Sequence, residues 1–465
     1  MSSDRVRLYN TLTRRVEDFA PINEGEVRMY TCGPTVYDYA HIGNLRAYVF
    51  ADVLRRTLEY AGYKVKQVMN ITDVGHLQSD ADEGEDKMTV ALRREGKPLS
   101  TTAMREVADF YFAAFKEDLE KLNIESPEKF PFASDHIREE VALIQKLLEK
   151  GLAYKTGDAI YFDTKNFPGY GKLGGLQTDA ESRVVNPEKR DPRDFALWKF
   201  NSELGYKASL GQGFPGWHIE CSAMSMKYLG ETFDIHTGGV DHIPIHHNNE
   251  IAQSEGATGK TFVKFWVHNA WLLVEENKMA KSAGSFFMLK DILGRGIDPL
   301  AFRFSLLMAS YRSPVNFTWE ALEGAASALK RLQRTYIGLG PAPRSAGKRE
   351  LGEVSPEYQE EFRAHIFDDL DTPGALAAMW ELLKDEKVSD ADKKAILLDF
   401  DRVLGLGISE WQAEEIPEEV LRLAREREKA RAEKDFEESD ALRDKINALG
   451  YEVRDTDEGQ RINKL

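Results

Sequence analysis

One stretch near the N-terminus constrains the fold of this chain more than any other. A β-type run from Val27 to Thr31 ends at Cys32, and a loop through His41 leads into an amphipathic segment from Asn44 to Tyr60. Apolar residues recur at helical spacing in that segment, and a second β-type run follows from Lys64 to Thr72. Strand, loop, helix and strand in this order form a right-handed βαβ crossover. The sequence therefore predicts an α/β fold built on a doubly wound parallel sheet of the Rossmann type.

The loop of this crossover carries side chains suited to a phosphorylated ligand. His41, Gly43 and Asn44 stand at the predicted helix start, where unpaired N–H groups and the helix dipole favour an anion. Cys32 stands at the carboxyl end of the first strand, where ligands of open parallel sheets usually lie. The same stretch thus offers a candidate nucleotide-binding loop and a thiol a few residues apart.

Composition narrows the class of protein. The chain has 465 residues, 42% of them apolar and 30% charged, which is typical of a globular protein, and its length suggests about three domains. No run approaches the roughly 18 apolar residues of a membrane helix, and the first residues lack the apolar core of a signal peptide. Cys32 and Cys221 are the only cysteines, which excludes a disulfide framework and fits a reducing compartment. We expect a cytoplasmic protein that does not associate with membranes.

The charge balance restricts the partners. A formal net charge of −16 argues against a general nucleic-acid coat or a membrane-surface binder. It permits an RNA partner, because only the local contact surface needs to be basic. The sequence contains no long apolar heptad pattern, so we expect a monomer.

The pattern of elements divides the chain into parts. An insertion, with a predicted helix from Ile137 to Glu149 and a hairpin from Ala153 to Thr164, separates two α/β stretches. From Pro299 the chain is predicted to be helical, and it ends in a charged helical hairpin followed by a short strand. The expected boundaries are 1–126 and 211–298 for the two halves of the α/β domain, 127–210 for the insertion, 299–340 for linking helices, 341–412 for a helical bundle and 413–465 for a small C-terminal module.

Two further predictions concern the core. A helix from Thr101 to Leu122 is expected to bury a set of apolar residues, namely Phe110, Phe112, Phe115 and Leu119. The strongly apolar run from Phe262 to Val274 is expected to form one buried strand.

A second cluster of chemically active residues stands in the second α/β stretch. Cys221 opens a predicted helix, and His246 and Glu250 lie four residues apart, on one face of the next helix. With Cys32 they offer two thiolates, an imidazole and a carboxylate, a tetrahedral set suited to zinc. Alternatively both cysteines are small buried side chains, as free cysteines usually are. Spacing alone does not choose His246 over the other histidines of residues 242–247.

A lysine-rich loop follows the apolar run. Lys278 and Lys281 can supply positive charge that closes over a developing transition state. A Lys-x-x-Lys loop is otherwise most often a solvated surface. Together with the His41 loop, however, it indicates nucleotidyl transfer.

Six strings of the sequence, taken as a set, are highly specific. They are Thr31-Cys-Gly-Pro-Thr-Val-Tyr-Asp-Tyr-Ala-His-Ile-Gly-Asn44, Asn70-Ile-Thr-Asp-Val74, Asp194-Phe-Ala-Leu-Trp-Lys199, Gly216-Trp-His-Ile-Glu-Cys-Ser-Ala-Met224, His246-His-Asn-Asn-Glu-Ile-Ala-Gln-Ser254 and Lys278-Met-Ala-Lys-Ser282. The set resembles the cysteinyl-tRNA synthetases, a family of class I aminoacyl-tRNA synthetases, over essentially the full chain. The C-terminal Asp435-Phe436 and Asp440-Ala-Leu-Arg-Asp444 are similar to the tail of that family.

The resemblance implies an activity and its ligands. The activity is ATP-dependent attachment of L-cysteine to its tRNA through a cysteinyl-adenylate, with Mg²⁺ accompanying ATP. The resemblance implies that one zinc ion is bound by Cys32, Cys221, His246 and Glu250. It places His41 and Asn44 in the HIGH-type motif and Lys278 and Lys281 in the KMSKS-type motif, with Gly43 and Asp241 also at ATP and Thr72 and Trp217 at the amino acid. By the same resemblance residues 127–210 form the connective insertion, 299–340 contact the tRNA stem, and 413–465 bind the anticodon.

The chain departs from the family pattern at a few places. Ala280 replaces the central serine of the lysine motif, and Asn248 replaces a common glutamate, but neither change removes an implied ligand. Gly75-His76 stands where the family often has two aspartates, and an acidic loop at 78–86 follows. The second lysine of a Lys-x-x-Lys pattern found there in many members is missing after Lys87. This weakens any carry-over of the pyridoxal-phosphate-dependent persulfide activity attributed to some members. The usual Trp-Arg-Arg ending is replaced by Gln460-Arg-Ile-Asn-Lys464.

Zinc offers a physical reason for choosing cysteine over serine. A zinc site stabilises a thiolate at neutral pH, whereas an apolar pocket separates near-isosteres by only about 10- to 200-fold. Two other functions share parts of this pattern. One is the related ligase that joins cysteine to an amino sugar in mycothiol synthesis, and the other is an inactive, synthetase-like RNA-binding paralogue. The tRNA-reading tail argues against the first, and the presence of all four metal ligands with His41 and both lysines argues against the second.

Overall fold

The computed structural model describes a defined part of the chain. The described residues are 5–75, 86–175, 188–274, 286–339, 356–412, 417–456 and 459–464, together with the backbone of 277 and 278. Within them, no helix is long and apolar enough to cross a membrane. The chain divides into two compact units, Met1–Ser409 and Glu410–Leu465.

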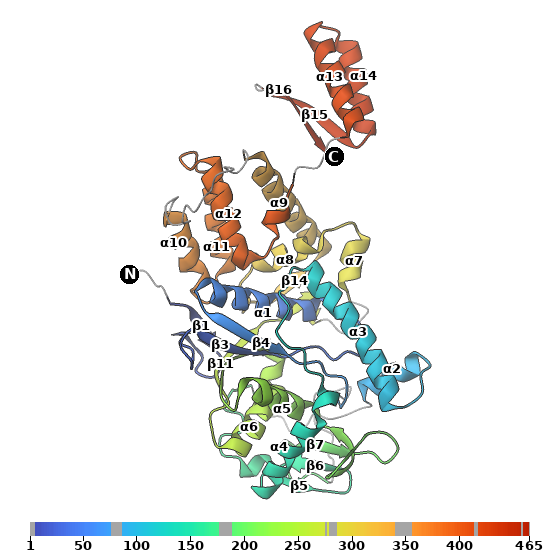
Figure 1. Cartoon of the computed structure of the whole chain (residues 1–465), viewed down its shortest axis with the longest axis vertical. Coiled ribbons are helices and arrows are strands. Elements are labelled where there is room, and N and C mark those ends of the chain that lie inside the picture. The colour runs from blue at the N-terminus through green and yellow to red at the C-terminus, as the bar shows by residue number, and fades with distance from the viewer. Residues whose placement is uncertain are drawn as a thin grey trace. The chain divides into compact units, whose positions relative to one another are not determined.

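A parallel four-stranded sheet lies at the centre of the larger unit. Its strand order is β11 (Val263–Asn269), β10 (Phe233–Gly239), β3 (Glu26–Thr31) and β4 (Lys64–Met69), and every neighbouring pair is parallel. Helix α1 (Ile42–Tyr60) connects β3 to β4, and α6 (Asn248–Thr258) connects β10 to β11. Figure 1 shows α1 and α6 on opposite faces of this sheet. The predicted doubly wound α/β fold is therefore confirmed. Its strand order reverses between β3 and β10, which opens a crevice at their carboxyl ends.

Helix α1 begins two residues before the predicted start, because of its cap. The ring Nδ1 of His41 accepts the backbone N–H of Asn44, and the Asn44 side chain accepts the backbone N–H of His41. This reciprocal cap stabilises the first turn. Leu45, Val49 and Leu54, which define the predicted apolar stripe, are all buried.

A second sheet forms the body of the predicted insertion. It is antiparallel, with strand order β5 (Ala153–Lys155), β6 (Ala159–Phe162), β7 (Phe195–Phe200), β9 (Gly211–Pro215) and β8 (Tyr206–Ala208). The hairpin β5–β6 turns at Gly157-Asp158 as predicted, and helix α4 (Ile137–Glu149) has the predicted bounds. Apolar side chains of α4 pack with those of β6, β7 and helix α5 (Trp217–Leu229) in one core.

Helices α2 (Lys87–Arg94) and α3 (Thr101–Lys121) enclose a separate core. Phe115 and Leu119 of α3 are buried, as predicted, and Phe112 is partly buried against this core. The prediction for Phe110 was wrong, since 56% of its surface is exposed. The buried stripe of α3 runs through Tyr111, Phe115 and Leu119 at four-residue spacing, which turns Phe110 toward solvent.

The apolar run from Phe262 to Val274 was predicted as one strand and is broken into two. After β11 ends at Asn269, the chain turns into β12 (Leu272–Val274), which pairs with β13 (Asn277–Lys278) and β14 (Val315–Phe317). The break arises because Ala270 donates its N–H to the carbonyl of Tyr311, while the Trp271 carbonyl accepts from Val315 and from the guanidinium of Arg46. These tertiary bonds outweigh the local preference for a continuous strand.

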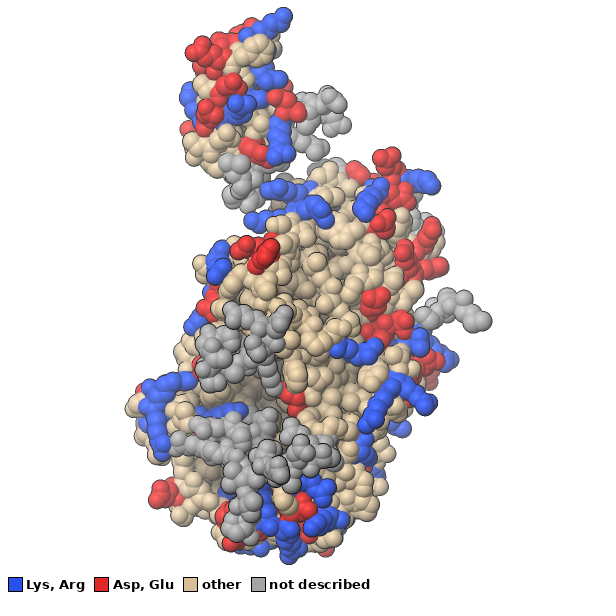
Figure 2. Space-filling view, turned by 180° about the vertical axis from the view of Figure 1, so that it is seen from behind, with Lys and Arg blue, Asp and Glu red and all other residues tan. Residues whose placement is uncertain are grey.

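The remaining elements of the larger unit are mainly helical. Helices α7 (Leu289–Gly294), α8 (Pro299–Leu307), α9 (Trp319–Gly338), α10 (Pro356–Ile366), α11 (Thr372–Lys384) and α12 (Asp390–Leu404) follow in order, and strands β1 (Arg7–Asn10) and β2 (Arg15–Asp18) form a small hairpin near the N-terminus. Strand β14 interrupts the stretch predicted to be helical from Pro299. Figure 2 shows acidic and basic side chains interspersed on the face it presents, with uncharged residues over much of the middle.

The smaller unit has its own core. It consists of α13 (Glu418–Ala432), α14 (Phe436–Ala448) and the antiparallel pair β15 (Tyr451–Thr456) and β16 (Gly459–Lys464). The charged helical hairpin was predicted, but its final strand is longer than expected and has a partner, β16. Buried apolar side chains of both helices and of β15 pack together. The Arg427 guanidinium on α13 binds the Asp455 carboxylate of β15 with both of its terminal nitrogens at 2.9 Å.

A buried arginine joins four segments of the larger unit. Arg303 of α8 is fully buried and forms an ion pair with Asp52 of α1 at 2.6 Å. It also donates to the carbonyl oxygens of Leu122, at the end of α3, and of Leu404, at the end of α12. The next residue, Gly405, has a φ of +62°, and a Cβ there would overlap the guanidinium.

We predict that Arg303→Met destabilises the larger unit by about 3 kcal/mol, because it leaves buried carbonyls unpaired and removes a charge partner of Asp52. The measurement is the shift of the urea unfolding midpoint. The exposed pair of Lys260 with Glu231 provides the control. Lys260→Met should leave the midpoint nearly unchanged, and a similar shift in both variants would contradict the role of Arg303.

Candidate functional site

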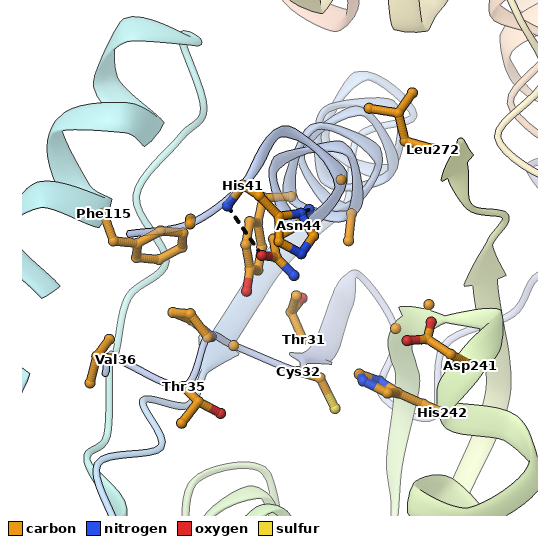
Figure 3. A pocket seen from close by; sticks show the side chains of 18 of the residues that line it. Thr31, Cys32, Thr35, Val36, His41, Asn44, Phe115, Asp241, His242 and Leu272 are labelled. Atoms are coloured by element: carbon orange, nitrogen blue, oxygen red, sulfur yellow. Dashed lines mark hydrogen bonds between the residues drawn. The ribbon is translucent and has the colours of Figure 1, made fainter. Parts of the chain in front are cut away.

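A cavity opens at the carboxyl ends of the central strands, at the point where the strand order reverses. Its volume is about 370 Å³. Its lining comes from the residues that follow β3, β10 and β11, and from the first turns of α1 and α5. The lining residues predicted from the sequence are Cys32, His41, Gly43, Asn44, Trp217 and Asp241. Figure 3 shows the labelled residues around this pocket.

The start of α1 presents a defined imidazole to the cavity. Because Nδ1 of His41 accepts the N–H of Asn44 at 3.1 Å, the neutral ring carries its proton on Nε2. Figure 3 shows the second bond of this cap, in which the Asn44 side-chain oxygen accepts from the His41 backbone at 3.3 Å. The His41 ring also packs edge-on against Phe286, with 5.1 Å between centroids. The helix N-terminus and the Nε2–H group would both favour an anion at this end of the cavity.

Four predicted metal ligands converge beneath the floor of this cavity, and Cys32 is the one of them that lines it. Ligand atoms of Cys32, Cys221, His246 and Glu250 all lie within 4.8 Å of one another. Their relative exposures are 8%, 1%, 2% and 0%. The Glu250 Oε1 atom is 3.0 Å from Nε2 of His246 and 4.0 Å from Sγ of Cys32. Two thiols, an imidazole and a carboxylate therefore form a compact, buried donor set that can hold a metal ion.

Three separate elements position these donors. Cys32 follows β3, and Cys221 lies in α5. His246 lies in a π-helical turn, Ile243–His247, which leads directly into α6, where Glu250 completes the first turn. A π turn widens the helix by one residue, and such turns are frequent at functional sites.

Burial and charge set the protonation of these groups. Burial raises the pKa of both thiols, that of Cys221 most strongly. Burial alone would lower the pKa of His246, but the Glu250 carboxylate raises it to about 10. Burial alone would raise the pKa of Glu250, but His236 and His246 lower it to about 2. In the absence of a metal, the carboxylate is therefore an anion held by imidazolium.

The structure also contains a second donor set that the sequence analysis did not find. Cys32 and Glu250 belong to it, together with His236 and His247. His236 Nε2 is 2.9 Å from Oε2 of Glu250, and His247 Nε2 is 3.3 Å from Sγ of Cys32. The sequence analysis considered His247 only as a neighbour of His246, and no spacing rule connects His236, which lies within a strand, to this site.

Further histidines hold the rings of both sets in place. Nδ1 of His246 is 2.8 Å from Nδ1 of His218, and Nδ1 of His247 is 2.7 Å from Nε2 of His268. The other ring nitrogen of His268 is 2.7 Å from the hydroxyl of Thr11. Such outer contacts select the tautomer and orientation of a ligand imidazole.

The other predicted site residues divide into three groups. Trp217 lines the cavity, with its ring centroid 4.2 Å from that of His246. Asp241, on the short helical turn Val240–His242, also lines it. Thr72 is absent from the described lining, because it is buried and donates its hydroxyl to Glu220 Oε2 at 2.8 Å. Lys278 is described only as a backbone residue of β13, and Lys281 lies outside the described residues, as does most of the acidic loop at 78–86.

The chain is similar to proteins of one family. Residues 18–327 match the model described as "tRNA synthetases class I (C) catalytic domain", and residues 413–462 match "Cysteinyl-tRNA ligase anticodon binding domain". A protein of Burkholderia lata named cysteine–tRNA ligase 1 is 47% identical, over 98% of this chain and 96% of its own length. The cysteine–tRNA ligase of Treponema denticola is 43% identical, over 97% and 98% of the two chains.

The fold is shared with a solved structure of low sequence identity. The methionyl-tRNA synthetase of Mycobacterium tuberculosis bound by methionyl-adenylate is 16% identical and has a TM-score of 0.55. The match covers 83% of this chain and 90% of that one.

We predict that Gly238→Ala lowers the amount of metal bound per chain. A Cβ at Gly238 would lie 2.7 Å from Cε1 of His247 and 2.8 Å from Nδ1 of His242, so both rings must move beside Cys32. Metal analysis of the purified protein should show at least a tenfold weaker affinity, the order expected when the outer contacts of a metal site are disturbed (about 10- to 100-fold). Gly324→Ala, in open space on α9, is the control. Equal metal content in both variants would contradict the prediction.

Proposed function

This chain belongs to the cysteinyl-tRNA synthetases, class I enzymes that ligate cysteine to tRNA. We propose which of its own residues bind the metal, the amino acid and ATP. The match to an anticodon-binding domain at 413–462 favours tRNA, rather than an amino sugar, as the acceptor of cysteine. The roles below rest on the geometry of the cavity and its floor.

We propose that the metal is zinc and that Cys32, Cys221, His246 and Glu250 hold it. Two buried thiols with one imidazole and one carboxylate match the donor preference of zinc, whereas magnesium and calcium prefer oxygen ligands. Zinc bound there would act as a Lewis acid. It would favour a substrate side chain that offers a thiolate over one that offers a hydroxyl. His236 and His247 would then act on Glu250 and Cys32 from outside this set.

The amino acid is proposed to lie between Cys32 and Trp217. Both residues line the cavity, and the Trp217 ring packs on the ring of His246. The indole would exclude water from the side-chain pocket, where shape alone discriminates poorly between cysteine and serine. The family resemblance implies that Thr72 contacts the substrate. Its backbone is bonded to Pro34 and Val36, so Thr72 would act through these residues or after they rearrange.

Activation is proposed to take place at the start of α1. There the α-carboxylate of cysteine attacks the α-phosphorus of ATP, the bond to the β-phosphate oxygen breaks, and pyrophosphate leaves. Nε2–H of His41 and the helix N-terminus would stabilise charge on the phosphates. Asn44 and Gly43 complete this turn, and Asp241 would accept from the ribose of ATP. Lys278 and Lys281 are proposed to neutralise the phosphates, with Mg²⁺ bound to ATP itself.

We further propose that the parts of the chain follow the boundaries expected from the sequence. Residues 127–210 would act as the connective insertion, 299–340 as the helices that contact the tRNA stem, and 413–465 as the anticodon-binding module. A monomer in the cytoplasm is the expected state. The single observation that carries the proposed function is the convergence of the four donors beneath the floor of a cavity whose opposite wall is the capped start of α1.

We predict that Cys221→Ser abolishes zinc binding and cysteine-dependent ATP–pyrophosphate exchange while leaving the affinity for ATP nearly unchanged. The reason is that Cys221 is a metal donor that does not line the ATP side of the cavity among the described residues. Zinc content, exchange rate and ATP affinity are measured on the same preparation. Loss of ATP binding together with exchange would show that the cysteine is structural. An active, metal-free wild-type protein would refute the zinc proposal.

We predict that His41→Asn slows the exchange reaction by about 10²- to 10³-fold, because it removes the Nε2 donor. Asparagine is a good N-cap residue, so the start of α1 should persist. The half-saturating concentration of cysteine should change little, since the metal floor is intact. An equally large loss in cysteine affinity would mean that the substitution disturbs the whole pocket.

A further inference from the structure

The cavity has a second wall that the proposed roles leave unused. It is made by the segment that follows Pro34 and by α2 and α3, and its residues are Tyr37, Tyr39, Lys87, Tyr111 and Phe115. In Figure 3, Val36 and Phe115 lie on one side of His41, and Asp241 and His242 lie on the other. The aromatic wall is thus opposite the side on which β10 ends.

The topology of the sheet explains this separation. The segment after β3 continues alongside β4, since Val36 donates to the carbonyl of Thr72 and Thr72 donates to the carbonyl of Pro34. It therefore leads away from the crevice between β3 and β10, where cysteine and ATP are proposed to bind. Three residues of this wall, Tyr37, Tyr39 and Tyr111, pack in the core of α2 and α3, which is distinct from the core that contains Cys32 and Cys221.

A specific set of contacts holds the wall in place. Arg94 of α2 donates to the carbonyl of Tyr37 at 2.8 Å, to Asp38 at 3.0 Å and to the hydroxyl of Tyr111 at 2.9 Å. The Tyr111 hydroxyl in turn donates to Glu95 at 2.8 Å. Lys87, the first residue of α2, has its Nζ atom 5.7 Å from the centroid of the Tyr37 ring. The wall therefore presents fixed aromatic rings beside a cation.

Resting on the proposed function, we propose that this aromatic wall binds the unpaired 3′-terminal nucleotide of the tRNA during the transfer step. Aromatic rings beside a lysine are the usual means of binding a single-stranded nucleotide, because the base stacks and the phosphate pairs with the cation. Tyr37 provides the stacking surface, and Lys87 contacts the phosphate. Asp38 is neutralised by Arg94 and does not repel the RNA.

This placement brings the two reactants together in one cavity. A ribose hydroxyl of the terminal nucleotide then faces the adenylate across His41 and Asn44. Its oxygen forms an ester bond to the cysteinyl carbonyl carbon, the bond from that carbon to the phosphate oxygen breaks, AMP leaves with the electron pair, and the hydroxyl proton is released. A nucleotide held at Tyr37 makes this step intramolecular within the complex.

The test compares the two half-reactions in Tyr37→Ala. ATP–pyrophosphate exchange reports adenylate formation, and single-turnover transfer from preformed adenylate to tRNA reports the second step. Loss of one base stack, worth about 1–3 kcal/mol, should lower the ratio of transfer rate to exchange rate by about 5- to 100-fold. Tyr37→Phe keeps the ring and should restore the ratio. Leu99→Ala, an exposed apolar residue between α2 and α3 outside the cavity lining, is the control and should behave as wild type.

A binding measurement makes the ligand specific. Wild-type protein should bind tRNA lacking its terminal adenosine more weakly than intact tRNA. In Tyr37→Ala this difference should become smaller, since the base has lost its stacking partner while Lys87 still contacts the phosphate. Three outcomes would overturn the proposal: a difference in binding as large in the variant as in the wild type, an unchanged ratio of transfer to exchange, or a parallel fall of both rates. A parallel fall would assign the wall to ATP binding or to folding. If wild-type protein showed no cysteine-dependent exchange, the proposed function itself would fail before any variant was compared.

Discussion

The fully buried carboxylate of Glu250 is the interaction on which the rest of the site depends. A buried anion is tolerated only when it is paired, and here His236 and His246 bind its two oxygens at 2.9 and 3.0 Å. One of these imidazoles comes from the centre of β10 and the other from the π turn before α6. The carboxylate therefore joins the end of the sheet to the second crossover helix and holds both next to Cys32. His246 is oriented by His218, and the second ring nitrogen of His236 faces the carbonyl of Thr237. The buried groups around Glu250 therefore form a polar network within an apolar core.

Buried arginines serve the same purpose on the other side of α1. Arg46, two residues beyond Asn44, donates to the carbonyl oxygens of Trp271, Tyr311 and Ser313, and burial lowers its pKa to about 10. These carbonyls belong to the turn before β12 and to the segment before β14. The small sheet from which the lysine loop extends is thereby attached to the helix that carries His41. Arg303 then joins the same helix, through Asp52, to the ends of α3 and α12. The placement of β12 and β14 against α1 thus depends on a buried cation.

Residue patterns along the chain predicted many helices and strands correctly, and they failed where tertiary contacts decide the local structure. The bounds of α4, the β5–β6 turn and the βαβ crossover followed from periodicity and turn residues alone. Phe110 was misplaced because hydrophobicity does not reveal which of two adjacent aromatic residues faces the core. The strand after Phe262 was predicted to be continuous, since no local residue forbids it, and only the bonds of Ala270 and Trp271 to residues 311 and 315 explain the break. The strand β16 was missed because its sequence is polar and its pairing with β15 is the stabilising feature.

The sequence by itself determined the family and the α/β class, because these depend on residue types at fixed spacing along single helices and loops. The four metal donors stayed a prediction that the family resemblance implied. It could not determine which histidines meet Cys32 and Glu250. His236 comes from β10, whereas His246 and His247 come from the π turn before α6, and only the packing of β10 against α6 brings their rings together. It also could not show that the cavity has two chemically different sides. The separation of a metal floor from an aromatic wall arises because the chain after β3 continues alongside β4, and that path is a property of the folded sheet.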